Sequence, residues 1–355
     1  MIDRPLPLER TTFALDQGFN QVIFTPEGKR IELGYNPIAE LRNLVSGNGV
    51  NTHLHLDRAH SLSRDSFVNA ANIPLQEKWD YVDLIKEHST EDQIFDRMAY
   101  ATEEMLSRGV RVIGTFIDVD SKVGHKAINA AIRLRDAYQH DAEIVFQNQT
   151  LKGVLSKEAY YWFCEGAQFV DHIGGLPRKD EGNMSAHLDI VLGTAKEMGK
   201  KAFVHVDQNN DPDERETELL LRKTIEHGME GSVVAIHAIS LSAQSDQYLD
   251  WLLPQVAAAK IQFITCPRAW IDARRNGSKS APIHNPITPV DLLLKHGITV
   301  AVGTDNTNDV YKPGAPSDII PELELIYECC RVRDLNTLAQ IATINGLRVL
   351  GLDSK

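Results

Sequence analysis

The sequence has few cysteines, and their spacing argues against a disulfide framework or a zinc knuckle. Four occur among 355 residues: Cys164, Cys266 and the adjacent pair Cys329 and Cys330. None stands in a Cys-x-x-Cys arrangement. Because disulfide frameworks and zinc knuckles need several cysteines at short, regular spacings, we expect four reduced thiols.

Long hydrophobic runs and dense clusters of positive charge are also missing. No apolar stretch approaches the roughly 18 residues that a transmembrane helix needs, and Met1 to Thr12 carries four charged residues in place of a signal-like apolar segment. The formal net charge is −12, and no cluster of Lys or Arg is dense enough to follow a phosphate backbone. We expect a cytoplasmic protein that binds a small molecule, without a nucleic-acid or membrane partner. A homo-oligomer is compatible with these features.

What the sequence does contain is a series of short apolar runs, rich in Val and Ile, that alternate with helical patterns. Such continuous runs indicate buried parallel strands, and their alternation with helices predicts an α/β protein with a parallel sheet, closed as a barrel or open. Eight strands over about 250 residues favour a (β/α)8 TIM barrel. The expected strands lie at 50–55, 110–118, 143–149, 169–174, 202–207, 233–238, 261–266 and 299–305. The expected helices lie at 93–107, 126–138, 185–198, 214–227, 245–259 and 289–296.

The chain is predicted to have two parts. Residues 1–45 form a short N-terminal β segment, in which weak strand signals at 21–25 and 30–33 flank a turn. Residues 46–355 form the barrel. Helical patterns at 321–332 and 336–350 then follow the last strand.

Potential metal ligands stand at the ends of these runs. His53 and His55 are two positions apart on a strand, so their side chains share one face. His205, His237 and Asp305 each follow or end a later apolar run. In a barrel the carboxyl ends of the strands meet at one rim, where active sites lie. A single histidine of this kind is more often structural, but five such residues in register predict a transition-metal site, because neutral imidazole is a common ligand for zinc and iron.

This set, carried on successive strands in that order, resembles the metal-dependent amidohydrolase superfamily and, within it, the cytosine deaminase branch. The likeness extends from about Val45 to Leu352. Val204-His205-Val206-Asp207 is similar to the fifth-strand signature of that branch, and Gly303-Thr304-Asp305-Asn306 is similar to its eighth-strand end.

The resemblance implies a role for each of these residues. His53, His55, His205 and Asp305 would hold one divalent ion, Zn²⁺ or Fe²⁺, with a position open for water. Asp305 would also act as the base, and His237 would stabilise the oxyanion that forms. The resemblance also places Gln149 and Asn306 at the substrate.

Two further features of the superfamily are missing here. Many members hold two metals bridged by a carboxylated lysine at the end of the fourth strand, but residues 173–177 contain no lysine. We therefore expect one metal. The small β-sandwich of the superfamily usually combines segments from both sides of the barrel, and we expect it to be reduced or absent.

The main departure from the branch is Gln208. The position three residues after the fifth-strand histidine is a glutamate in the branch, where it moves a proton to the ring nitrogen and on to the leaving ammonia. A glutamine amide forms hydrogen bonds but cannot carry that proton. We therefore predict a mononuclear metal-dependent hydrolase that cleaves a non-peptide C–N bond, of amide or amidine character, in a small nitrogen-rich cyclic compound, with release of an amine or ammonia.

Two alternatives stay open. One is a cytosine deaminase-like aminohydrolase in which Gln208 only positions the substrate, and the other is a metal-bound protein without turnover. Several more residues are candidates for contact with a ligand. Trp79 and Tyr311 offer aromatic surface to a pocket, and His60, His125 and His284 stand in loops expected at the same rim.

Overall fold

The computed structural model describes residues 14–15, 21–24, 27–70, 73, 75–149, 151–272 and 285–353. The chain divides into two compact units, Met1–Leu44 and Val45–Lys355. In the part of the chain that is described, no helix has the length and apolar composition needed to cross a membrane.

The first unit contains a three-stranded antiparallel sheet in the order β1 (Ala14–Leu15), β2 (Gln21–Phe24) and β3 (Arg30–Leu33). β2 and β3 correspond to the strands predicted at 21–25 and 30–33. Helix α1 (Pro37–Val45) follows and was not predicted. Its first turn is capped by Asn36, whose side-chain oxygen accepts hydrogen bonds from the backbone N–H groups of Ile38 and Ala39 at 3.0 and 3.1 Å.

The second unit is an α/β structure with parallel sheets. One sheet has the order β4 (Gly49–Leu54), β5 (Val110–Asp118), β6 (Glu143–Gln149). The other has the order β7 (Ile173–Gly175), β8 (Ala202–Val206), β9 (Val233–His237), β10 (Gln262–Thr265), β11 (Val300–Val302). All neighbouring strands within these two sheets are parallel.

The two sheets meet at both edges. Isolated parallel bridges join Leu54 to Asp305 on one side and Gln147 to His172 on the other. At the first edge the backbone N–H of Asp305 donates to the carbonyl of His53 at 2.9 Å. At the second the N–H of His172 donates to the carbonyl of Phe146 at 3.1 Å. The first and last strands therefore lie side by side.

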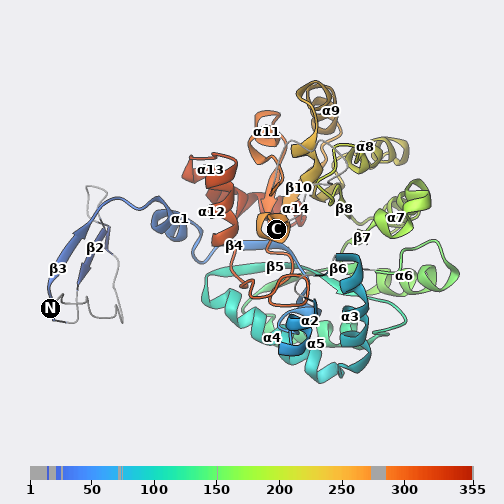
Figure 1. Ribbon diagram of the computed structural model, residues 1–355, viewed down its shortest axis with the longest axis horizontal. Coiled ribbons are helices and arrows are strands. Elements are labelled where there is room, and N and C mark those ends of the chain that lie inside the picture. The colour runs from blue at the N-terminus through green and yellow to red at the C-terminus, as the bar shows by residue number, and fades with distance from the viewer. Residues whose placement is uncertain are drawn as a thin grey trace. The chain divides into compact units, whose positions relative to one another are not determined.

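Helices lie around the outside of these strands, as Figure 1 shows for α4 to α9. Helices α2 to α11 lie between strands in the sequence, and α12 to α14 follow the last strand. The helices are α2 (Arg64–Ala70), α3 (Leu75–His88), α4 (Glu91–Ser107), α5 (Lys126–Tyr138), α6 (Lys157–Phe169), α7 (Met184–Glu197), α8 (Glu216–His227), α9 (Asp246–Ala258), α10 (Pro267–Trp270), α11 (Val290–Lys295), α12 (Ile320–Cys329), α13 (Leu335–Ile341) and α14 (Ile344–Val349). Short 3₁₀ helices are η1 (Leu56–Arg58), η2 (Pro177–Asn183) and η3 (Ile239–Ala243).

The core between the strands is apolar. Buried side chains from successive strands, among them Phe116, Phe203, Ile236 and Ile264, form one cluster. Val349 and Leu350, at the end of the last helix, belong to the same cluster. Burial of these side chains removes apolar area from water, which stabilises the fold by roughly 25 cal/mol per Å².

Some of the predicted elements differ from the structure in their bounds. The strand expected at 299–305 is shorter, because β11 covers Val300–Val302. The strand expected at 169–174 starts later, because Phe169 is the last residue of α6 and β7 begins at Ile173. The helix expected at 336–350 is two helices, α13 and α14, separated at Thr343, where the backbone has φ −134° and ψ −96°. The break frees the carbonyl of Ala342 to accept a hydrogen bond of 2.8 Å from the N–H of Val50 on β4.

Candidate active site

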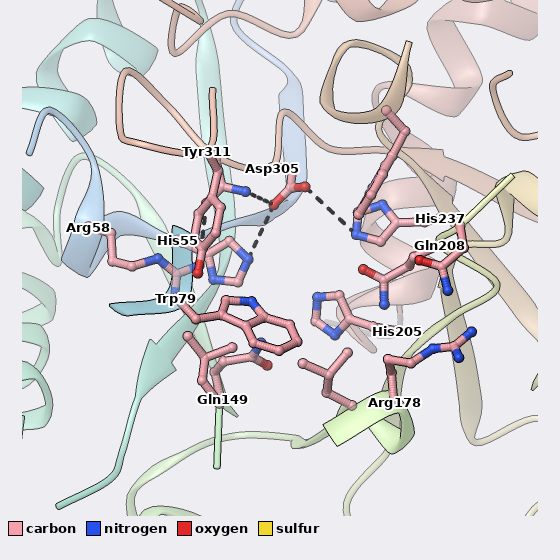
Figure 2. Close-up of a pocket in the computed structure, with 15 residues that line it drawn as sticks. His55, Arg58, Trp79, Gln149, Arg178, His205, Gln208, His237, Asp305 and Tyr311 are labelled. Carbon is pink, nitrogen blue, oxygen red and sulfur yellow. Dashed lines mark hydrogen bonds and ion pairs between the residues drawn. The ribbon is translucent and has the colours of Figure 1, made fainter. Parts of the chain in front are cut away.

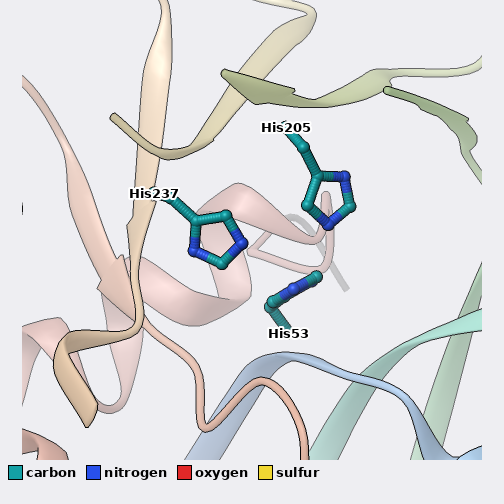
Figure 3. Close-up of side chains that lie close together, drawn as sticks. All are labelled: His53, His205 and His237. Atoms are coloured by element: carbon teal, nitrogen blue, oxygen red, sulfur yellow. The ribbon is translucent and has the colours of Figure 1, made fainter. Parts of the chain in front are cut away.

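The structure brings the five predicted rim residues together. His53 lies on β4 and His55 directly after it, His205 lies on β8, His237 ends β9, and Asp305 follows β11. All are at most 4% exposed. Figure 3 shows His53, His205 and His237 turned toward one another.

The side chains in this cluster lie close enough together to share one metal ion. The ring centroids of His53 and His205 are 4.9 Å apart, and those of His205 and His237 are 5.3 Å apart. Asp305 Oδ1 lies 3.2 Å from His55 Nε2 and 3.4 Å from His53 Nε2, while Oδ2 lies 3.7 Å from His237 Nε2. Two triads have atoms close enough to share an ion: His53, His205, His237 and His53, His55, Asp305.

The backbone at the strand ends is held in an uncommon conformation. His237, Ala238 and Asp305 have positive φ values of 74°, 48° and 57°. Residues other than glycine rarely adopt this left-handed region, and where they do the surrounding structure must hold them there. Here His237 turns out of its strand while its carbonyl accepts a hydrogen bond from the hydroxyl of Thr288.

Gly303 allows the last strand to approach the first. A Cβ added at this position would lie 2.7 Å from both the Cβ and the carbonyl oxygen of His53. Backbone atoms cannot yield to such a contact without movement of the strand. The absence of a side chain at Gly303 therefore positions Asp305 beside His53.

Burial keeps three of the imidazoles neutral. Burial lowers the pKa of His55 to about 3, and the positive charge of Arg58 acts in the same direction. Burial also lowers the pKa of His237 to about 3 and holds the pKa of His205 well below its usual range. Neutral imidazole is the form that binds a metal.

Asp305 keeps its negative charge in this environment. Burial alone would raise the pKa of its carboxyl group, but the neighbouring imidazoles, His53 and His55 first, hold that pKa well below its usual range. The cluster thus combines one carboxylate with the neutral imidazoles of His55, His205 and His237 and the buried imidazole of His53. Such a donor set suits a divalent ion of intermediate softness, such as Zn²⁺ or Fe²⁺.

Buried nitrogen atoms without a partner provide a direct test of this fit. Within the described part of the chain, five ring nitrogens are buried without a hydrogen-bond partner: Nδ1 and Nε2 of His53, Nδ1 of His55, Nε2 of His205 and Nδ1 of His237. The other nitrogen of His205, Nδ1, lies 3.2 Å from the carbonyl oxygen of Gly175. If Nδ1 carries the proton and donates it there, Nε2 presents a lone pair to the cluster, the arrangement that orients histidine ligands in metal sites. The residues present therefore fit a metal ion.

A cavity opens beside this cluster, with a volume of about 630 Å³ when the open space at its mouth is included. Figure 2 shows several of its lining side chains turned toward it. All predicted substrate contacts reach it: Trp79 on α3, Gln149 at the end of β6, Gln208 after β8, and Asn306 and Tyr311 after β11. The remaining lining residues are His55, Arg58, Leu151, Leu176, Arg178, His205, Asn209, His237, Trp270 and Asp305.

Two of the other candidates lie away from the cavity. His60 Nε2 is 3.0 Å from Glu104 Oε2, and His125 Nε2 is 3.1 Å from Glu165 Oε2. Neither lines the cavity. His284 lies outside the described residues.

Sequence reasoning missed Arg58, a charged residue that lines the cavity and lowers the pKa of His55. Its guanidinium Nη1 donates to both carboxylate oxygens of Asp118 at 2.8 and 2.9 Å, and Nη2 donates to Asn306 Oδ1 at 3.3 Å. Asn306 in turn donates to Asp305 Oδ1 at 3.0 Å. The side chain of Lys86 lies 3.0 Å from Asp118 on its other side. The available signal was the position of Arg58, three residues after His55.

Arg178 and Trp270 were also missed. Arg178 lies on η2 and pairs with Glu181, Glu214 and Glu216. Trp270 ends α10, directly after β10. Neither position carries a pattern in the sequence that indicates a pocket, because both depend on how a loop folds over the strand end.

Comparisons with known proteins agree with this geometry. The family model of the amidohydrolase family matches residues 47–355. An uncharacterized protein of Haemophilus influenzae is 45% identical over 254 residues, which cover 71% of this chain and 92% of the relative. A pterin deaminase of Rhizobium rhizogenes is 23% identical over 314 residues, covering 84% of this chain and 68% of that protein.

Solved structures show the same fold. The 5-methylcytosine deaminase of Klebsiella pneumoniae, liganded with phosphonocytosine, aligns with a TM-score of 0.80 at 20% identity over 97% of this chain and 85% of its own. N-isopropylammelide isopropylaminohydrolase of Burkholderia multivorans aligns with a TM-score of 0.71 at 22% identity over 86% of this chain and 75% of its own. The chain belongs to the amidohydrolase family and is a hydrolase that acts on carbon–nitrogen bonds.

Proposed function

We propose that this protein is a mononuclear metal-dependent hydrolase that cleaves a non-peptide C–N bond in a small nitrogen-rich ring compound and releases an amine or ammonia. The observation that carries the proposal is the convergence of four buried imidazoles and the Asp305 carboxylate beside a cavity. The charge, burial and unpartnered nitrogens of this cluster support a metal, and the adjoining cavity supports a small substrate.

The catalytic part is residues 46–355, folded as a closed (β/α)8 barrel with residues 1–45 as a separate N-terminal β segment. The parallel bridges at both edges of the two sheets support closure. Eight parallel strands in chain order, each followed by a helix or helical turn, support the barrel type.

In this proposal His53, His55, His205 and Asp305 hold one Zn²⁺ or Fe²⁺ ion. When bound, the ion supplies Lewis-acid activation of a water molecule, whose pKa it lowers towards about 7. β7 ends in Ile173-Gly174-Gly175 without a lysine to bridge a second ion. One ion per chain is therefore the proposed state.

In this proposal Asp305 transfers the proton, and His237 stabilises the negative charge that develops on the substrate oxygen. The two oxygens of Asp305 face different partners, Oδ1 the histidines of the first strand and Oδ2 His237. This division lets Oδ1 serve as a ligand while Oδ2 takes the proton of the attacking water and later passes it to the leaving nitrogen. His237, neutral and adjacent, donates a hydrogen bond to the oxygen that becomes negative.

Gln208 is proposed to contact the substrate. Figure 2 places it beside His205 and His237 at the edge of the cavity, where its amide can donate and accept hydrogen bonds. Trp79 supplies aromatic surface, and Gln149 and Asn306 supply amide groups, for a planar ring with polar edges. The proteins compared above are named for action on pterin, 5-methylcytosine and N-isopropylammelide, which are ring compounds of this kind.

A second candidate is a cytosine deaminase-like aminohydrolase in which Gln208 only positions the ring and Asp305 performs all proton transfer. The structural likeness to the 5-methylcytosine deaminase favours keeping it. The third possibility, a metal-bound protein without turnover, rests on the absence of the glutamate at position 208.

One experiment separates the three. Purified protein is analysed for metal and then assayed for release of ammonia and of alkylamines from pyrimidines, pterins, triazines and hydantoins. We expect one ion per chain and release from an N-substituted or amino-substituted ring. Efficient release of ammonia from cytosine would favour the second candidate, and bound metal without any release would favour the third.

A further inference from the structure

Trp270 contributes an aromatic wall to the cavity next to His237. It is the last residue of α10, a single helical turn that begins with Pro267 directly after β10. The centroid of its ring lies 5.4 Å from that of His237, at an interplanar angle of 67°. Trp270 therefore lies beside His237, the residue proposed to stabilise the developing oxyanion.

Nε1 of Trp270 is inaccessible to solvent, although the residue as a whole is partly exposed. Among the residues that the structure describes, this indole N–H has no hydrogen-bond partner. An indole N–H can donate but cannot accept. A buried donor left unpaired is destabilising, so this N–H calls for a partner that the described residues do not supply.

The other groups around the cavity show what this donor can meet. Among the described lining residues Asp305 is the one carboxylate, and it is engaged with the histidines. Arg58 and Arg178 are donors only, while Gln149 and Gln208 offer both donors and acceptors. The indole N–H of Trp270 is a donor only, so a substrate that pairs with it must present an acceptor atom beside it.

We propose that Trp270 is a specificity-determining residue whose indole N–H donates to an acceptor atom of the substrate, a ring nitrogen or an oxo oxygen, beside the carbon that is attacked. The inference rests on the proposed function, because it takes the reacting carbon to lie between the proposed metal ligands and His237. It adds a chemical requirement: rings with a C–H group at that position leave the indole N–H unpaired and bind less well.

The test uses two pairs of probes that differ in this atom. Cytosine and 3-deazacytosine differ by a ring nitrogen next to the amino-bearing carbon, and 2-aminopyrimidine and aniline differ by both flanking nitrogens. Dissociation constants are measured by calorimetry on metal-loaded wild type, Trp270→Phe and Trp251→Phe. Trp270→Phe removes the N–H but keeps an aromatic ring against His237. Trp251 lies on α9, 51% exposed, so Trp251→Phe makes the same chemical change away from the cavity.

Wild type and Trp251→Phe are expected to prefer the nitrogen-containing member of each pair by roughly 5- to 150-fold, the range for one buried hydrogen bond made or lost. In Trp270→Phe this preference should fall to nearly none. Equal weakening of both members would show that Trp270 only packs, and an unchanged preference would show that its N–H is not used. Either result overturns the proposal.

Turnover measured in parallel keeps this inference apart from the proposed function. A Trp270-dependent preference in binding without release of ammonia or amine from any screened ring would support the role of Trp270 while overturning the proposed hydrolysis. If ammonia or an amine is released but the binding preference is unchanged in Trp270→Phe, the proposed hydrolysis is supported and the role of Trp270 is overturned. Failure of wild type to bind any of the four probes at millimolar concentration overturns the inference.

Discussion

The backbone N–H of Asp305 donates a 2.9 Å hydrogen bond to the carbonyl oxygen of His53, which joins the last parallel strand to the first. Through this contact the carboxylate of Asp305 is brought within 3.4 Å of the imidazole of His53. The contact that joins the edges of the two sheets therefore also assembles the candidate metal site. Changes at this edge should affect stability and metal binding together.

Gly303→Ala tests that coupling. The new Cβ would meet backbone and Cβ atoms of His53 at 2.7 Å, so the strands must separate. Overpacking of this kind typically costs about 1–3 kcal/mol. We expect a lower free energy of unfolding in denaturant together with reduced metal content. Gly182→Ala is the matched control, because a Cβ there meets nothing within 4 Å. If Gly303→Ala binds metal as wild type does, the contact between the first and last strands is not what assembles the metal site.

Metal content tests the ligand set. His53, His55, His205 and Asp305 should bind one ion per chain, because four ligands leave room for a water. Elemental analysis of purified protein should give one zinc or iron per chain, and His205→Ala should lose most of it. Two tightly bound ions, or none after supplementation with metal, would contradict the proposed site.

Substitutions of Asp305 and His237 should differ in their effect on the metal. Asp305→Ala should remove at least about 10²-fold of activity, the lower end of what a general base contributes. His237→Asn should also reduce activity severely while much of the metal remains, since His237 is proposed to act outside the ligand set. His237 also belongs to a triad with His53 and His205. Metal loss in His237→Asn equal to that in His205→Ala would therefore reassign His237 as a ligand.

Gln208→Glu distinguishes the candidate reactions. If the native reaction needs no proton carrier at this position, the substitution places a charge where the substrate presents a matched polar group. Mispairing a buried polar group costs on the order of 1–3 kcal/mol, or roughly 5- to 150-fold in kcat/KM. Activity on the native substrate should fall by that factor, while weak deamination of cytosine-like rings emerges. If wild type deaminates cytosine efficiently and Gln208→Glu makes no difference, the protein is instead the cytosine deaminase-like aminohydrolase of the second candidate.

Glu322 should make stability depend on pH. Burial raises the pKa of this carboxyl group from 4.5 to about 8, despite the N–H of Arg268, which donates to its Oε2 at 2.8 Å. Between these two values the folded state binds more protons than the unfolded state, so stability falls as pH rises from about 4.5 to 8. Each unit of pKa shift corresponds to about 1.4 kcal/mol.

Glu322→Gln keeps the shape and an acceptor but cannot ionise. Unfolding in denaturant is compared for the two proteins at pH 5 and pH 8, with the same metal present. The stability of the variant relative to wild type should increase from the lower to the higher pH. A difference that stays constant would show that Glu322 is already charged in the folded protein near pH 5.

Much of the parallel-strand framework followed from local pattern. β5 and β6 match their predicted bounds, and other strands such as β8 and β9 differ by one residue at an end. Strands covered on both faces are continuously apolar, so they stand out in the sequence. Because parallel strands end at one rim, residues at or just after the ends of those runs, among them His205 and Asp305, could be grouped from the sequence alone.

Contacts between loops and across the rim were decided only by tertiary structure. Arg58 reaches the cavity because Asp118, distant in sequence, holds its guanidinium, and Trp270 reaches it because a short turn carries it over the end of β10. His60 and His125 point elsewhere because each meets a glutamate on a neighbouring helix, Glu104 or Glu165. Sequence patterns record the burial of a segment. The direction of a loop side chain is instead set by partners that only the folded chain brings near.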